Sequence, residues 1–427
     1  MLKNSKIPAW KNPEVLNDQS KVEYFEYTTI FNHQVDRPAY QLRAYDSHPS
    51  WARHPERLPP ALLLGELLFN SPDVLGPRAR FFGLSCASCH PNGAASLDIN
   101  VGPQTRIPGG IDLLSDYFTP MADDGIFNPR NVPSLRGARY TAPYGHAGSI
   151  ASLGEFIDHV AGVELGQPPM RSDWREALVL YLEQLDFLPD PQVDALGRLT
   201  AKASESAHRG EKLFAQPRAG LDGLSCASCH IPESLFTDRR THLFRHGKYD
   251  ASPNEAFDTP SLLGMDETPP YFYDGSAPTL AKAVDAIDTR QALALTDDEK
   301  ADLTAYLRAI GAVDRPAAPP RLDAQVNQAL AYLRLVLRGS TRGDRGLWPL
   351  CLDTVSHQLR GVLRAQPSAI ASRLEPSIRA FAKAVRVPAH RAPSAANRAV
   401  IRKLRGDIQA ALKAVRATPA PPPAPPR

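Results

Sequence analysis

The chain has 427 residues, of which 43% are hydrophobic and 22% are charged, a composition typical of a globular protein with two or three domains. No apolar run of about 18 residues occurs, so the sequence predicts no transmembrane segment. The net charge is +3, but the charges are unevenly distributed along the chain. Residues 321–427 hold 19 basic and 5 acidic side chains, whereas residues 1–320 hold 30 basic and 41 acidic side chains. No nucleic-acid-binding motif accompanies this basic tail, so we expect no nucleic-acid partner.

The first 60 residues form an N-terminal extension in which we find no motif. The start, Met-Leu-Lys-Asn-Ser-Lys-Ile-Pro-Ala-Trp-Lys, lacks the apolar stretch of about seven residues that a secretory signal peptide contains. The sequence therefore shows no visible export signal in this extension.

One octapeptide, Gly-Leu-Ser-Cys-Ala-Ser-Cys-His, occurs twice without change, at residues 83–90 and 223–230. Each copy ends in Cys-x-x-Cys-His, the attachment pattern of c-type haem, in which two thiols bond the vinyl groups and the histidine binds the iron. The sequence therefore predicts two covalently bound haem c groups with His90 and His230 as proximal iron ligands. The attached cysteines would be Cys86, Cys89, Cys226 and Cys229.

Two other uses of these cysteines compete with haem attachment. Zinc sites also contain Cys-x-x-Cys pairs, but a single closed site needs only four ligands, and zinc does not explain why a histidine follows both pairs. A disulfide within each pair is typical of a redox motif beside a βαβ pattern, which neither copy has. We therefore favour haem over zinc, and zinc over disulfides.

A second repeat follows each haem motif at a constant offset of 127 residues. Each half has the order helix, haem motif, proline-bounded loop and closing helix, which indicates an internal duplication. We predict a mainly α-helical protein with two cytochrome c-like haem domains in tandem, at 61–190 and 196–314. Long loops are expected because 41 prolines and 27 glycines interrupt the helical pattern. The repeated positions include Pro133, Gly137, Tyr144 and Gly148, which recur as Pro260, Gly264, Tyr271 and Gly275.

The closing helices carry the clearest helical signals. Thr296 and Glu299 form a capping box, and the apolar residues that follow lie along one face of the predicted helix. The segment from Ser172 to Leu185 is its counterpart in the first half. Aromatic residues on these helices are more often part of the core than of an electron relay.

A proline-rich linker at 315–320 precedes a basic, helical C-terminal tail, which spans 321–427. Two amphipathic helices are predicted, and the basic face of the last is either solvated or docks on an acidic electron donor. The proline-rich end is expected to be disordered. Cys351 has no partner in the haem motifs, so it is either a buried thiol or an intermolecular contact. The helices are marked by Val326, Leu330, Leu333 and Leu337, and by Ile401, Leu404, Ile408 and Leu412.

Several short motifs of the second half carry a family resemblance. They are Arg-Gly-Glu-Lys-Leu-Phe at 209–214, the haem motif, Phe-Thr-Asp at 236–238, Thr-Pro-Ser-Leu at 259–262 and Pro-Tyr-Phe-Tyr-Asp-Gly-Ser at 270–276. Together they resemble the dihaem cytochrome c peroxidases and the related MauG-type enzymes over roughly residues 60–314. The resemblance implies exported proteins that reduce hydrogen peroxide with electrons from a small redox protein. Relatives in the MauG branch oxidise a protein substrate, and some relatives hold calcium between the domains, for which this chain offers no ligands that we can assign.

The resemblance also implies Met or Tyr as the second ligand of one haem, but this chain has Ile287 at that position. That haem is then either five-coordinate or bound by another residue, with Met265 and His242 as candidates. Val160 occupies the equivalent position in the first half, and its neighbour His159 is a candidate ligand there. Met265 is more often a core residue than a ligand, and His159 is equally interpretable as a packing residue.

The distal acid–base group is inferred from the same resemblance. The family uses a Gln and a Glu ten residues apart, where naive alignment places Phe156 and, two residues short, Glu164. We choose Glu164 as the group that moves a proton between the peroxide oxygens, against the alternative of an exposed loop carboxylate. His146 stands where the family has its inter-haem tryptophan, and its imidazole is a second candidate for proton transfer.

These observations predict a periplasmic dihaem peroxidase, an iron-dependent oxidoreductase that reduces hydrogen peroxide at the first haem. Electrons would come through the second haem from a cytochrome or cupredoxin. The rivals are a dihaem electron-transfer cytochrome without an open iron, and MauG-like oxidation of a protein or organic partner. Because covalent haem attachment requires export, we interpret the given start of the chain as truncated or misassigned. A homodimer is one oligomeric state left open.

Overall fold

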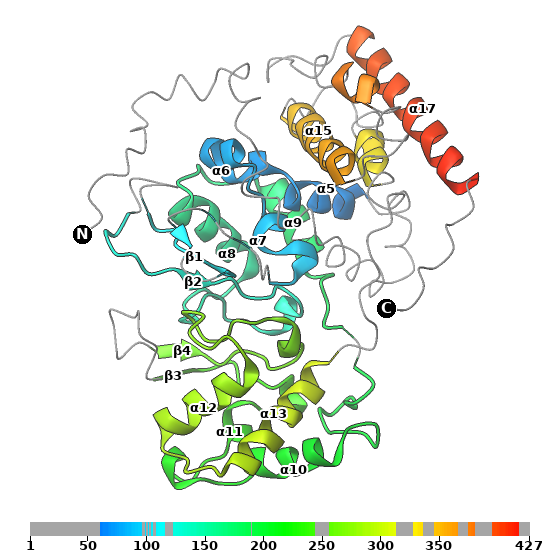
Figure 1. The fold of residues 1–427 in the computed structure, drawn as a ribbon. Helices are drawn as coiled ribbons and strands as arrows, with labels where there is room; N and C mark the ends of the chain where they lie inside the picture. The colour runs from blue at the N-terminus through cyan, green and yellow to red at the C-terminus, as the bar shows by residue number, and fades with distance from the viewer. Residues whose placement is uncertain are drawn as a thin grey trace, which may run out of the picture.

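The structure is a computed structural model that describes residues 60–95, 99, 101, 104–105, 108–115, 123–188, 190–243, 256–312, 328–335, 346–365, 375–380 and 395–417. Over these residues the protein is mainly helical, as predicted. The N-terminal extension before residue 60, the proline-rich end, Val326 and Leu337 lie outside the described residues. Figure 1 shows the first half, coloured from blue through cyan to blue-green, above the second half in green to yellow-green, with α15 and α17 of the tail in orange and red beside the first half.

The first half is organised around a pair of packed helices, α5 (Pro60–Phe69) and α9 (Ser172–Leu182). Their backbones approach closely because Gly65 has no side chain, and a Cβ there would lie 2.0 Å from the carbonyl oxygen of Ala177. Phe69 contacts Tyr181 across the same helix pair, with ring centroids 5.2 Å apart. Among the described residues this half also contains the helices α6 (Gly76–Phe82), α7 (Cys86–Cys89) and α8 (Leu153–His159), and a π-helical turn at Val160–Glu164.

The second half repeats this arrangement with α10 (Glu205–Phe214) and α13 (Asp297–Gly311). Gly210 takes the place of Gly65, since a Cβ there would lie 2.1 Å from the carbonyl oxygen of Asp302. Phe214 contacts Tyr306 with ring centroids 5.1 Å apart. The predicted capping box at Thr296 is present at the start of α13. The remaining helices are α11 (Cys226–Cys229) and α12 (Leu280–Gln291).

The proline-bounded loops also repeat in detail. Tyr144 forms an isolated antiparallel bridge with Ile150, and its hydroxyl donates to the carbonyl of Ala138 over 3.0 Å. Tyr271 forms the equivalent bridge with Ala277 and donates to the carbonyl of Met265 over 2.8 Å. The 127-residue repeat therefore corresponds to a repeated backbone path.

Two short antiparallel strand pairs were not predicted from the sequence. In the first half β1 (Gly110–Ile111) pairs with β2 (Arg130–Asn131), and in the second half β3 (Thr241–Leu243) pairs with β4 (Ala256–Asp258). Segments of two or three residues are too short to show a recognisable alternation. Figure 1 places both pairs close to the level at which the two halves meet.

The C-terminal tail packs on the first half. Its long helices are α15 (Leu347–Ala365) and α17 (Ala395–Ala417), and residues 328–335 are also helical. The apolar side chains of these segments share one hydrophobic core with α5 and α9. The buried tail residues include Leu330, Leu333, Cys351, Val355, Leu359, Ile401, Leu404 and Ile408.

Cys351 is a fully buried thiol whose Sγ donates to the carbonyl of Tyr332 over 3.2 Å. This position agrees with the first of the two predicted alternatives. Among the described residues, no helix combines the length and the apolar character needed to cross a membrane.

Candidate haem sites

The two Cys-x-x-Cys-His motifs fold in the same way. The cysteines lie at the ends of one-turn helices, α7 and α11, and in each copy a serine pair forms a capping box. The Ser85 amide donates to the Ser88 hydroxyl over 2.9 Å, and Ser225 donates to Ser228 over 3.0 Å. This turn brings both thiols of a motif and the following imidazole into one neighbourhood, as haem attachment requires.

The histidines fit the role of proximal ligands. Nδ1 of His230 is hydrogen-bonded to the carbonyl oxygen of Phe236 at 3.0 Å, which leaves Nε2 as the nitrogen available to iron. Nδ1 of His90 is buried without an aligned partner, although the Pro133 backbone lies close enough to oppose the lowering of the His90 pKa. Burial lowers the pKa of His90 to about 4 and lowers that of His230, so both imidazoles are neutral and able to bind a metal ion.

The cysteines also fit covalent attachment. Among the described residues all cysteines are free thiols, and those of the haem motifs are half-buried. Burial raises the pKa of Cys86 and of Cys89 to about 12 and raises the pKa of both thiols in the second motif. Neutral thiols of this kind can add to vinyl groups, and no disulfide within either pair is present.

The two identical octapeptides differ in their surroundings. Leu84 in the first copy is 4% exposed, whereas Leu224 at the same place in the second copy is 54% exposed. Leu84 packs in a cluster with Ile99, Val101 and Ile111, which come from the longer segment that follows the first motif. The first motif is therefore covered by its own half, and the second lies at the surface.

Glu164 and His159 lie together beside the first motif. His159 Nε2 and Glu164 Oε1 are 4.0 Å apart, at the start and end of the π-helical turn. Burial raises the pKa of Glu164 to about 7, and the positive charge of Arg130 opposes this shift. The pKa of Cys89 is raised mainly by burial, and then by the neighbouring Cys86 and by the charge of Glu164. The last effect shows that Glu164 is near the first haem motif.

His146 lies at the contact between the halves. Its ring meets Tyr273 edge to face, with centroids 4.5 Å apart, and its carbonyl accepts from the Asp258 amide over 2.8 Å. Burial and then Arg130 lower the pKa of His146 to about 4. The Arg130 guanidinium lies 4.8 Å from the centroid of the Tyr273 ring. Arg130 and Tyr273 had no role in the sequence-based site, because the sequence gives no signal for contacts between the two halves.

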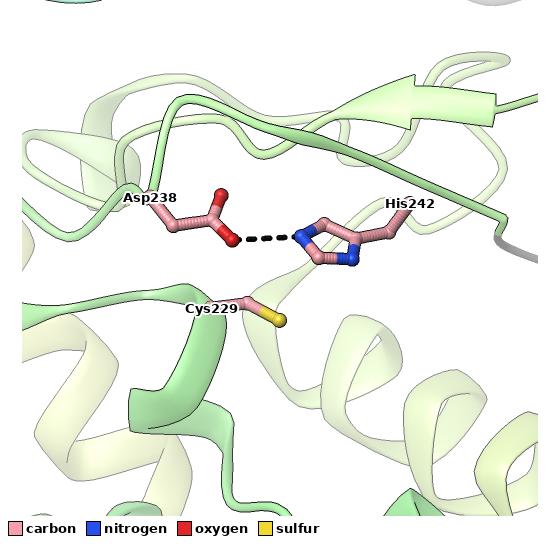
Figure 2. A group of neighbouring side chains, drawn as sticks. All are labelled: Cys229, Asp238 and His242. Carbon is pink, nitrogen blue, oxygen red and sulfur yellow. Dashed lines mark hydrogen bonds and ion pairs between the residues drawn. The ribbon is translucent and has the colours of Figure 1, made fainter.

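The candidate ligands of the second haem lie in different settings. Met265 begins a 3-10 turn and packs with hydrophobic residues of both core clusters in the second half. His242 lies on β3, and its Nε2 is 2.7 Å from a carboxylate oxygen of Asp238. Figure 2 shows the thiol of Cys229 below this ion pair, and the three side chains could together hold a metal ion. Cys226 is not part of this group, so the group differs from the four-ligand zinc site considered in the sequence analysis.

Comparison with known proteins found several proteins to which this chain is similar. Hydrazine synthase subunit gamma of Kuenenia stuttgartiensis is 27% identical over 283 residues, which cover 53% of this chain and 72% of that subunit. A structure of hydrazine synthase from the same organism, pressurized with 20 bar xenon, has 24% identity and a TM-score of 0.41 over 57% of this chain and 85% of that chain. The crystal structure of a MauG-like protein associated with microbial copper homeostasis has 17% identity and a TM-score of 0.42. The match covers 62% of this chain and 92% of that chain.

The family model described as di-haem cytochrome c peroxidase matches residues 204–317, which include the second haem motif and the repeated loop. The motifs of the second half that suggested the relationship all lie within this segment. The predicted resemblance to the dihaem cytochrome c peroxidase and MauG superfamily is therefore confirmed over residues 204–317, in the second half of the chain.

Proposed function

We propose that this protein is an exported, periplasmic dihaem c-type cytochrome that reduces hydrogen peroxide to two molecules of water. The reaction consumes two protons and two electrons, which a small cytochrome or cupredoxin supplies. The observation that carries the proposal is the unequal burial of the two identical haem motifs, with Leu84 covered and Leu224 exposed. A covered site suits the reaction with peroxide, and an exposed site suits exchange of electrons with a protein.

The first half contains a suitable acid–base group. Bound haem would supply the iron at which peroxide is reduced. His90 would bind this iron, and Cys86 and Cys89 would attach the haem through thioether bonds. Because burial raises the pKa of Glu164 to about 7, this carboxyl group is present in both protonation states near neutral pH. It can accept a proton from one peroxide oxygen and donate it to the other, so that water leaves.

The second half offers a surface for the electron donor. Leu224 provides an exposed apolar contact two residues before Cys226, and Asp222, two residues before Leu224, is also exposed. The exposed arginines Arg239 and Arg240 follow shortly after the motif. This surface therefore offers a redox partner an apolar contact at Leu224 with charged groups of both signs nearby.

The test is the absorption and EPR spectrum of haem-loaded protein, oxidised and half-reduced, before and after one equivalent of hydrogen peroxide. We expect a high-spin ferric signal from an open iron, and its conversion by peroxide. Two low-spin signals that peroxide leaves unchanged in either redox state would overturn the peroxidase proposal.

The second candidate is an electron-transfer subunit or an oxidase of a protein or organic partner. Phe156 and His146 stand where the family has its distal Gln and its inter-haem Trp, and the 27% identical relative is named as a subunit of hydrazine synthase. Consumption of peroxide with a reduced cytochrome as the only electron source would favour the peroxidase. Conversion of peroxide that proceeds only when an organic reductant is present would favour the second candidate.

A further inference from the structure

Each half has a glutamate directly after the glycine at which its two helices pair, but the two glutamates are bound by different parts of the chain. Glu211 Oε1 accepts from the Leu199 amide over 2.9 Å, and Leu199 lies in the loop before α10, in the same half. Glu66 Oε1 accepts from Nε2 of Gln328 over 2.8 Å, and Gln328 belongs to the tail. The tail therefore provides for the first half a hydrogen bond that the second half provides for itself.

The contact between the tail and the end of α5 contains further polar groups. Gln358 on α15 donates from Nε2 to Oε1 of Gln328 over 3.1 Å, so a second tail residue holds the Gln328 side chain. Nδ2 of Asn70 donates to the hydroxyl of Tyr332 over 3.4 Å and to the carbonyl of Glu66 over 2.8 Å. Glu66 itself is only 3% exposed. Its carboxyl group is therefore buried where the tail packs on the first half.

Glu66 lies close to the first haem motif. Burial raises the pKa of Tyr181, and the charge of Glu66 and then Cys86 add to this effect, whereas Arg136 opposes it. Cys86 and Ala87 of the motif also pack against the hydrophobic core that Tyr181 and the tail share. A charge on Glu66 is therefore within electrostatic reach of a haem attached at Cys86.

The second half has the same arrangement without the tail. Burial, then the charge of Glu211, then Cys226 raise the pKa of Tyr306. Cys226 and Ala227 pack against a core to which Leu199 also contributes. Glu211 is therefore a matched reference for Glu66, with a donor from its own half in place of Gln328.

We propose that the tail sets the reduction potential of the first haem, because Gln328 holds Glu66 as a buried carboxylate beside it. The proposal rests on the proposed function only in assuming that both motifs hold haem. An N–H group that donates to a carboxylate stabilises its charged form. A buried negative charge in turn favours ferric over ferrous iron, since the ferric state has one more positive charge. Gln328 is a positioning residue, since it acts on the haem through Glu66.

The test is a spectroelectrochemical titration of the haem-loaded full-length protein, which measures the reduction potential of each haem. Glu66→Gln removes the charge and keeps the shape, and we expect it to raise the potential of one haem only. Glu211→Gln is the matched control in the second half and should leave the potential of that haem unchanged. Gln328→Met should raise the potential of the same haem as Glu66→Gln, by at most the same amount. In the Glu66→Gln background, Gln328→Met should cause no further shift.

Cys351 reports whether the tail stays in place. When both haems are attached, the other cysteines form thioethers, so Cys351 is the free thiol, and it is fully buried in the tail. Its resistance to alkylation shows that the tail remains docked in a variant. Arg402→Gln removes an exposed charge from α17 and should leave both potentials unchanged, which separates the effect of Glu66 from the overall charge of the tail.

Unchanged potentials in Glu66→Gln would overturn the proposal, and so would a shift in Gln328→Met that persists in the Glu66→Gln background. If Gln328→Met exposes Cys351 to alkylation, Gln358→Met decides the question, because it removes the support of Gln328 and keeps Gln328 itself. A raised potential of the same haem is then the expected result, and an unchanged potential contradicts the proposal. These measurements use no peroxide, so they test the role of the tail even if the protein does not reduce peroxide.

Discussion

Arg130 influences both acid–base candidates of the first half. Its charge opposes the burial that raises the pKa of Glu164, and it adds to the burial that lowers the pKa of His146. Burial disfavours a charged group of either sign, whereas a nearby cation favours a carboxylate and disfavours an imidazolium. The same guanidinium therefore favours an ionised Glu164 and a neutral His146 at neutral pH.

Replacement of Glu164 by Gln removes the group that we assign to proton transfer. We expect the reaction of haem-loaded protein with peroxide to slow by roughly 10²- to 10⁴-fold, the usual contribution of a general acid–base group. In the unchanged protein the rate should rise as pH increases through about 7, because the ionised form accepts the proton. The Gln variant should lack this inflection in stopped-flow measurements. Glu176→Gln changes an exposed carboxyl group and is the control, and an equal effect of both substitutions would refute the assignment.

The side chains in Figure 2 allow an experiment that distinguishes haem attachment from metal binding at the second motif. One sulfur cannot form a thioether to haem and also serve as a thiolate ligand, so the two uses of Cys229 exclude each other. We expect His242→Ala to retain two covalently bound haems per chain by intact-protein mass spectrometry, and Cys229→Ala to lose one attachment bond. Loss of stoichiometric zinc in His242→Ala, from a chain without the second haem, would support the metal site instead.

At the scale of elements, the sequences of α5 and α10 differ because their surroundings differ. Both helices pack on a closing helix through a glycine. In α5 the sequence Pro-Ala-Leu-Leu-Leu-Gly-Glu-Leu-Leu-Phe is apolar almost all round, since α9 covers one side and the tail covers another. In α10 the exposed face is polar, with Glu205, Arg209 and Lys212 open to solvent.

The close approach of the paired helices makes a prediction for Gly210. A Cβ at this position would lie 2.1 Å from the Asp302 carbonyl oxygen, so Gly210→Ala must push α10 and α13 apart. We expect a lower free energy of unfolding, by about 1–3 kcal/mol as for other overpacked sites. Gly154→Ala on α8 is the control, because its nearest neighbour would be 3.6 Å away, at the Arg175 side chain. Thermal unfolding should show a lower Tm only for Gly210→Ala, and equal Tm values would contradict the packing argument.

Most of the helical framework was predictable because its signals are local. The capping box at Thr296 and the apolar spacing of the closing helix depend on residues within a few positions of each other. The strands were missed because β1 and β2 have two residues each and are held by a partner about twenty positions away. The predicted helix at Ser172 to Leu185 ends earlier in the structure, at Leu182.

At the scale of the whole molecule, the tail is joined to the first half by charge as well as by apolar contacts. Arg80 on α6 lies 2.9 Å from Asp73 and 3.7 Å from Asp353 on α15. Burial, and then the charge of Asp353, raise the pKa of Asp73 to about 7, against the opposing effect of Arg80. Two carboxyl groups therefore share one guanidinium where the tail meets the body.

This arrangement predicts a pH dependence of stability. A carboxyl group whose pKa is raised from 3.8 to about 7 in the folded protein stabilises it at low pH, and this stabilisation is lost as pH rises through about 7. Asp353→Asn removes the repulsion, so we expect its Tm to exceed that of the unchanged protein at pH 8 and to differ little at pH 5. Asp186→Asn, which alters a surface ion pair of the first half, serves as the control. A lower Tm of Asp353→Asn at pH 8 would show that its pairing with Arg80 outweighs the repulsion.

The sequence by itself determined the chemistry of attachment and the internal repeat, since eight consecutive residues contain everything that a c-type haem motif needs. Only the tertiary structure decided which copy is covered, because an identical octapeptide contains no information about the distant segments that pack on it. The tertiary structure also decided that Arg130 lies near Glu164 and that Tyr273 lies at the contact between the two halves. These residues are far from their neighbours in the sequence. The packing of the tail on α5 was also decided by the tertiary structure. An apolar helix face in the sequence predicts that the face is buried, but it does not show which segment buries it.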